Sequence, residues 1–123
     1  MPLITYSNLA VPFIKALQGE TNEEKFMKIA ACAKHFAVHS GPESMRHFFD
    51  AKATMKDMWE TYLPQFEASV VDANVESVMG AYNRTNGEPC NAHKYLMEDV
   101  LRGKWGFEGH YVSDCWAVKD FHE

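Results

Sequence analysis

Three short apolar runs, with helical patterns between them, constrain this chain more than any other feature of its sequence. The runs start near residues 31, 76 and 110, and each ends in polar residues. The starts are about 45 and 34 residues apart, which leaves room for a helix in each interval. Strands joined by such helices run parallel, and parallel strands need cover on both faces. The pattern therefore predicts an α/β fold of successive parallel β/α units, with strands at about 30–37, 76–82 and 109–114.

The segment before the first strand predicts a helix. In the stretch SNLAVPFIKALQG, Leu9 and Phe13 recur at the spacing of one helix face. Ser7 is a suitable N-cap and Gly19 is a natural C-terminal stop. Pro12 predicts a kink or a later start, because proline removes a hydrogen bond inside a helix.

The intervals between the strands predict further helices. Apolar side chains recur every four residues over 58–70, and Pro64 divides this pattern into a short helical turn and a longer helix to about residue 73. Residues 92–103 predict another helix, with Asn91 as cap and Gly103 as stop, and residues 115–123 begin a last one. Loops are expected at 40–53 and 84–91. Four large side chains of the 58–70 pattern are expected in the core: Met58, Trp59, Tyr62 and Phe66.

Composition excludes several classes of protein. The chain has 123 residues, of which 46% are hydrophobic and 24% charged, and a net charge of −5. No Lys/Arg cluster indicates a nucleic-acid surface, and no apolar run approaches the roughly 20 residues of a membrane span. Three cysteines without CxxC spacing argue against a disulfide scaffold or a zinc site. Metal-ligand spacings and Gly-rich phosphate loops are absent, so no cofactor is predicted, and the N-terminus lacks the pattern of a signal peptide.

Polar side chains gather where each predicted strand ends. In β/α proteins these carboxyl ends share one edge of the sheet, where functional groups collect. Asp114 follows the third strand directly, which suits a carboxylate nucleophile held rigidly against a sugar ring. Its position is equally compatible with a cap of the following helix. The candidates, strand by strand, are Lys34, His35 and His39; Met79, Tyr82, Asn83 and Arg84; and Ser113 and Asp114.

Four strings resemble the N-terminal catalytic domain of glycoside hydrolase family 3, in the order found there. They are AKHFAVHSGPESMRHFFDA, ETYLPQFEASV, SVMGAYNRTNGEPC and LRGKWGFEGHYVSD. The resemblance covers nearly the whole chain. It implies a partial (β/α)8 TIM barrel of about three strands with flanking helices, forming a single domain over residues 1–123. KHFAVHS departs from the KHFPGHG of the N-acetylhexosaminidase branch, so a β-glucosidase or β-xylosidase is implied.

The same resemblance implies roles for particular residues. The Asp of the family's Ser-Asp motif falls on Asp114, the nucleophile of retaining hydrolysis. The Lys-His pair that binds sugar hydroxyls falls on Lys34 and His35. The resemblance also gives substrate-binding roles to Tyr82, Arg46 and His47. It places Met79 next to the sugar-binding subsite. The implied substrate is a terminal β-linked oligosaccharide or an aryl glycoside.

The chain also departs from the family pattern. The first barrel strands and the general acid/base residue are not found in it, and a closed barrel uses about 250 residues. We therefore expect a fragment that is weakly active or inactive alone and that has the remaining barrel and sandwich domains as partners. Two alternatives stay open at this point: a non-catalytic sugar-binding module, and a truncated product without independent activity.

Overall fold

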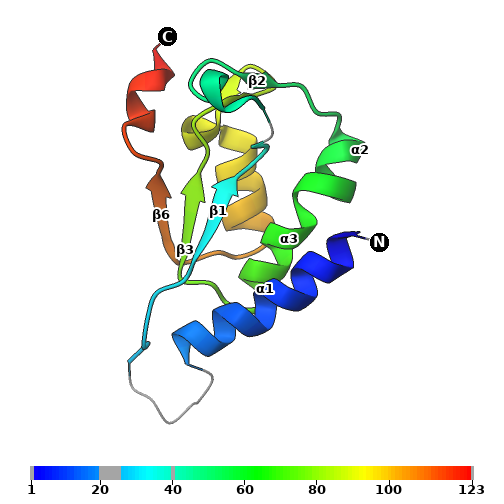
Figure 1. Cartoon of the computed structure of the whole chain (residues 1–123), viewed down its shortest axis with the longest axis vertical. Coiled ribbons are helices and arrows are strands. Elements are labelled where there is room, and N and C mark those ends of the chain that lie inside the picture. The colour runs from blue at the N-terminus through cyan, green and yellow to red at the C-terminus, as the bar shows by residue number, and fades with distance from the viewer. Residues whose placement is uncertain (1, 20–25, 40, 123) are drawn as a thin grey trace.

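The computed structural model describes residues 2–19, 26–39 and 41–122 and contains a central sheet of three parallel strands. The strands are β1 (Cys32–Phe36), β3 (Ser77–Gly80) and β6 (His110–Ser113), in the spatial order β1-β3-β6 (Figure 1). Within this sheet, each strand therefore pairs with the sheet strand that follows it in sequence, as in a (β/α)8 barrel. The predicted fold class and the three predicted strands are confirmed.

The described residues bury one face of this sheet. The cross-strand row Ala33, Val78 and Tyr111 belongs to or packs against the hydrophobic core. The next row is more open, since Lys34 is exposed while Met79 and Val112 are half-buried. The expectation of cover on both faces is therefore not met by the described residues, because the second row remains partly open.

Helices enclose the core from the side of that buried row. Helix α1 (Pro2–Gln18) packs against α3 (Pro64–Glu67) and η3 (Ala68–Asp72) beside β1, whereas η5 (Tyr95–Lys104), drawn in yellow to orange, lies behind β3 (Figure 1). The core contains Met58 and Phe66, with Trp59 and Tyr62 packed against it, as the four-residue spacing predicts. Other fully buried side chains are Phe36, Leu63, Leu96, Leu101, Val78 and Val100.

Helix α1 starts earlier than expected. It begins at Pro2, where the fixed φ of proline suits the first helical turn, so Ser7 lies inside the helix and is no N-cap. Pro12 also lies within the helix. The predicted stop is confirmed: Gly19 has a φ of +91°, and its N–H donates to the Lys15 carbonyl over 2.9 Å.

The segment 55–72 is divided at Pro64, as predicted. It comprises α2 (Met55–Asp57), η2 (Met58–Tyr62), α3 and η3. Pro64 occupies the first position of α3, where its missing N–H has no intrahelical partner to lose. The start of α2 carries a capping box, in which Thr54 Oγ1 accepts from the Asp57 N–H over 3.1 Å.

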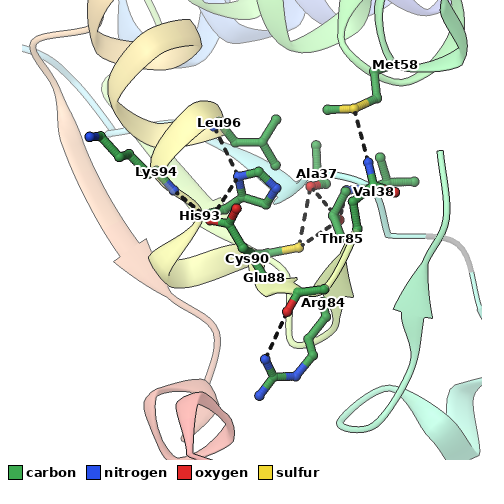
Figure 2. Close-up of polar contacts among 12 residues, drawn as sticks. Ala37, Val38, Met58, Arg84, Thr85, Glu88, Cys90, His93, Lys94 and Leu96 are labelled. Carbon is green, nitrogen blue, oxygen red and sulfur yellow. Dashed lines mark hydrogen bonds and ion pairs between the residues drawn. The ribbon is translucent and has the colours of Figure 1, made fainter. Parts of the chain in front are cut away.

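The limits of η5 differ from the predicted ones. Asn91 is buried within the short helix η4 (Cys90–Ala92) and donates to the Ala81 carbonyl over 2.7 Å, so it does not cap η5. His93 Nδ1 instead accepts from the Leu96 N–H over 3.4 Å (Figure 2). Gly103 lies inside η5, and Gly106 supplies the positive φ of +65° just after it. A glycine two residues after the helix could not be distinguished from Gly103 by sequence spacing.

A small second sheet was not predicted. It joins β2 (Asp50–Ala51), β4 (Arg84–Thr85) and β5 (Glu88–Pro89), and it lies beyond the carboxyl ends of the main strands (Figure 1). Asn86 and Gly87 connect β4 and β5 with φ values of +51° and +94°, the signs of a type I′ hairpin turn. The remaining elements are two 3₁₀ helices, η1 (Glu43–Met45) and η6 (Ala117–Phe121). Among the described residues, no helix has the length and apolarity that would let it span a membrane.

Candidate active site

Asp114 lies directly after β6, and both of its carboxylate oxygens have a partner. Oδ1 accepts from the Cys115 N–H over 2.8 Å, and Oδ2 lies 3.2 Å from His35 Nε2. The side chain is 15% exposed, so it remains open to a bound molecule. Helix η6 begins after Trp116 and has no side-chain cap, so the alternative in which Asp114 caps a helix is wrong.

His35 contributes a neutral imidazole to this contact. Burial is the largest effect on its pKa and lowers it from 6.5, aided by the charge of Lys34, while the Asp114 carboxylate opposes the shift. His35 Nε2 lies 3.2 Å from Asp114 Oδ2, so a neutral ring with its proton on Nε2 presents that N–H toward the carboxylate. His35 therefore orients the carboxylate without adding a full positive charge to the site at neutral pH.

Lys34 occupies the exposed row of the sheet, next to Met79 on β3. Within the described ranges its ammonium group forms no ion pair, and its exposure removes the burial cost that a lysine in an apolar run would incur. The pairing register with β3 shifts between Lys34 and Phe36, so side chains do not alternate regularly at this point. Lys34 is therefore available to a ligand lying on the open face of the sheet.

Tyr82 connects Asp114 to the loop that follows β1. Its hydroxyl lies near the Asp114 carboxylate, and its pKa is raised, first by burial and then by the charge of that carboxylate. Arg46 Cζ lies 5.0 Å from the centre of the Tyr82 ring, and the ring centres of His47 and Tyr82 are 4.4 Å apart. The structure thus brings Tyr82, Arg46 and His47 together beside Asp114.

Two further residues complete the surroundings of these groups, one that sequence analysis missed and one that it listed as a strand-end candidate. Asp120, on η6, is 4% exposed, and its Oδ2 lies 2.7 Å from His47 Nδ1. His39, noted above only as a strand-end residue, places its ring 5.1 Å from that of His35. Sequence analysis missed Asp120 because it sits in a short charged stretch that is typical of an exposed helix face.

Buried polar side chains hold the end of β1 beneath the site. Asn83 Nδ2 donates to the Val38 carbonyl over 2.8 Å. Thr85 Oγ1 accepts from the Val38 N–H over 3.1 Å and donates to the Ala37 carbonyl over 3.2 Å, with Cys90 Sγ close by at 3.2 Å (Figure 2). These contacts satisfy backbone groups of Ala37 and Val38, which follow β1. They therefore fix the backbone conformation of the segment after His35.

The polar groups around Asp114 suit an organic ligand with several hydroxyl groups. One carboxylate, one imidazole, one phenol and two cationic side chains offer donors and acceptors on neighbouring strand ends. The described part of the chain contains no group of three His, Cys, Asp or Glu side chains arranged to hold a metal ion.

Several known proteins are similar to this chain in sequence. The profile described as "Glycosyl hydrolase family 3 N terminal domain" matches residues 4–123. A xylan 1,4-beta-xylosidase from Xylanibacter ruminicola is 46% identical over 123 residues, covering 99% of this chain and 14% of that protein. A beta-glucosidase from Bacteroides ovatus is 36% identical over 117 residues, covering 95% of this chain and 15% of that protein.

Solved structures agree with these sequence matches. A GH3 exo-beta-xylosidase in complex with a xylobiose aziridine activity-based probe superposes with a TM-score of 0.85 at 34% identity, covering 93% of this chain and 15% of that one. A beta-glucosidase from Listeria innocua in complex with isofagomine superposes with a TM-score of 0.81 at 32% identity, covering 94% and 16%. This chain therefore spans about one seventh of the length of the relatives that it matches.

Proposed function

Because this chain belongs to glycosyl hydrolase family 3, we propose that it carries the nucleophile of a retaining β-glycosidase, and that Asp114 is that nucleophile. The observation that supports this most directly is the Asp114 carboxylate itself. It lies at the carboxyl end of a parallel strand, is only 15% exposed, and is oriented by His35 Nε2 at 3.2 Å. A nucleophile in this role must be ionised and held rigidly against the sugar, and both conditions fit these contacts.

The reaction would proceed in two steps. A carboxylate oxygen of Asp114 bonds to the anomeric carbon while the glycosidic C–O bond breaks, and a general acid protonates the departing oxygen. Water then attacks the same carbon, the bond to Asp114 breaks, and the general base takes the proton from the water. The anomeric configuration is retained because the carbon is inverted twice.

The other site residues would bind the sugar. Lys34 donates charge-assisted hydrogen bonds to sugar hydroxyls, which gain strength as charge develops in the transition state. The neutral His35 ring accepts a hydrogen bond from a further hydroxyl at Nδ1. Tyr82 lies beside the Asp114 carboxylate, whose charge raises the pKa of its hydroxyl after the larger effect of burial. Arg46 and His47 line the side of the site that faces Tyr82.

Met79 lies in the same cross-strand row as Lys34 and Val112, on the open face of the sheet. We assign it an apolar contact with the bound sugar.

Retaining chemistry needs a second carboxyl group about 5–5.5 Å from the first. Two other acidic side chains near the described site are already paired: Glu43 with Arg46 at 2.5 Å, and Asp120 with His47 at 2.7 Å. The general acid/base is therefore assigned to a segment outside these 123 residues. It follows that the chain by itself should hydrolyse glycosides weakly or not at all.

The proposed substrates are terminal β-xylosides and β-glucosides, released one sugar at a time from a non-reducing end. The names of the relatives support this range, since they include a xylan 1,4-beta-xylosidase, an exo-beta-xylosidase and beta-glucosidases. The 46% identity to the Xylanibacter ruminicola enzyme makes a β-xyloside the first substrate to test.

A chimaera would test the nucleophile. In it, residues 1–123 replace the matching segment of the Xylanibacter ruminicola xylosidase, and hydrolysis of 4-nitrophenyl β-xyloside is followed. We expect an active chimaera whose Asp114 is alkylated by a xylobiose aziridine, as located by peptide mass spectrometry. Asp114→Asn should lower kcat by at least about 1000-fold and abolish the adduct. An adduct on another residue would refute the assignment, and full hydrolysis by the 123-residue chain alone would refute the external acid/base.

A further inference from the structure

We propose that Asp120 is a positioning residue of this site, which holds the His47 ring against Tyr82 with Nδ1 protonated and Nε2 as the acceptor that faces Arg46. The proposal rests on the proposed function, in which His47 and Tyr82 belong to the sugar-binding site around Asp114. It adds a residue from η6 that no sequence motif indicated.

The contact between Asp120 and His47 defines the tautomer of the ring. An ionised carboxylate can only accept hydrogen bonds, so His47 Nδ1, at 2.7 Å from Asp120 Oδ2, must carry a proton. The carboxylate is 4% exposed, and a charge buried to this extent is costly unless it is paired. In the described part of the chain Asp120 Oδ1 has no hydrogen-bond partner, so the His47 contact is the main compensation for that burial.

The backbone of η6 is anchored independently of this contact. Arg84 donates from one guanidinium nitrogen to the Asp120 carbonyl over 3.1 Å and from the other to the Gly87 carbonyl over 3.2 Å. The Asp120 main chain is thereby fixed to the β4–β5 hairpin. A carboxylate carried on an anchored backbone can set the orientation of a ring that belongs to an exposed loop.

The oriented ring affects the candidate nucleophile through one intermediate residue. The ring centre of His47 is 4.4 Å from that of Tyr82, and the Tyr82 hydroxyl lies close enough to the Asp114 carboxylate for that charge to raise its pKa, after the larger effect of burial. With Nδ1 protonated, His47 Nε2 is the acceptor of the ring, and it accepts from Arg46 Nε over 3.4 Å, so the ring also positions the Arg46 side chain. Without Asp120, the proton can occupy either nitrogen, and the ring loses both its fixed orientation and its defined acceptor.

Nitrogen NMR of the 123-residue chain would test the tautomer without any activity. Long-range proton–nitrogen spectra should show His47 protonated at Nδ1 in the unchanged chain. Asp120→Leu, which removes the acceptor, should shift the proton toward Nε2, whereas Asp120→Asn, which keeps an acceptor, should shift it less. Asp99→Asn, a change on the exposed face of η5, is the matched control and should leave His47 unchanged.

Kinetics of the chimaera described above would test the consequence. Asp120→Leu should lower kcat/KM by roughly 10- to 100-fold, as expected when a reacting group is misplaced by about 1 Å. Asp120→Asn should recover most of this loss, which a simple packing role would not produce. If Asp120→Leu fails to fold, Asp120→Asn must still lower kcat/KM several-fold.

An unchanged His47 tautomer, or equal kcat/KM in both Asp120 variants and the unchanged chimaera, would overturn the inference. The aziridine adduct separates this result from a failure of the proposed function. An adduct on Asp114 together with unaffected Asp120 variants would refute only the role of Asp120. An adduct elsewhere would refute the assignment of the nucleophile.

Discussion

Replacing Thr85 by valine should show how firmly the chain after His35 is held beneath the site. Valine has nearly the same shape as threonine but lacks the hydroxyl. Thr85 is fully buried, and its hydroxyl accepts from the Val38 N–H over 3.1 Å and donates to the Ala37 carbonyl over 3.2 Å. The substitution therefore leaves two buried backbone groups without this partner.

The size of the effect follows from those two groups. An orphaned buried polar group costs about 1–3 kcal/mol. The Ala37 carbonyl keeps a weak contact with Cys90 Sγ at 3.4 Å, whereas the Val38 N–H loses its side-chain partner outright. We expect Thr85→Val to lower the free energy of unfolding by about 2–4 kcal/mol, a large share of the 5–15 kcal/mol that is usual for a domain.

Urea denaturation of the 123-residue chain would measure this loss, and Thr85→Ser is the matched control. Serine keeps the hydroxyl and removes one methyl group, which should cost only about 1 kcal/mol. With a slope of about 2 kcal/mol per molar urea, the valine variant should unfold at a midpoint roughly 1–2 M lower, with an unchanged slope. A valine variant as stable as the serine variant would show that the hydroxyl contacts do not hold this segment, and the reasoning would be refuted.

Three further outcomes follow from burial. Leu96→Ala, at a fully buried core position, should lower the free energy of unfolding by about 2–5 kcal/mol in the same urea assay, and a loss below 1 kcal/mol would contradict its central place in the core. Folding lowers the pKa of His35 from 6.5, so His35 is protonated in the unfolded chain at a higher pH than in the folded chain. The contribution of a neutral His35 to the free energy of unfolding is therefore complete above about pH 6.5, and it is lost as the pH falls toward the folded pKa. His35→Gln should therefore flatten the dependence of stability on pH between about 7.5 and 5, and an unchanged slope would refute the shift. Burial raises the pKa of the Cys90 thiol to about 11, so a thiol reagent followed by mass spectrometry should label the exposed Cys32 and Cys115 in the folded chain but reach Cys90 only in denaturant.

Local signals in the sequence were sufficient for much of the fold. The three strands and their parallel order follow from apolar runs spaced by helical patterns, and Pro64 marked the start of α3 because proline restricts its own φ. Signals that several residues could supply were less informative. Ser7 and Gly103 had the right chemistry for helix ends, yet α1 begins at Pro2, before Ser7, and η5 ends at Lys104, after Gly103.

The candidate site divides in the same way. Asp114, Lys34, His35 and Tyr82 were found because parallel strands of one sheet must present their carboxyl ends at a common edge, so polar residues that follow each strand are brought together by topology alone. That reasoning predicts which residues lie close together, but it does not predict which atoms form hydrogen bonds or ion pairs.

The amino-acid sequence by itself determined the α/β class, the parallel direction of the strands and the edge of the sheet at which the polar groups meet, since these depend on periodicity and turn chemistry over a few residues. Only the tertiary structure decided that Asp114 faces His35 and that Thr85 forms a hydrogen bond with the backbone just after β1. It also decided that Asp120 contacts His47, which lies 73 positions away in the sequence. Such contacts depend on how whole elements pack, and the packing free energy is shared among many buried side chains and cannot be read from any short stretch of sequence.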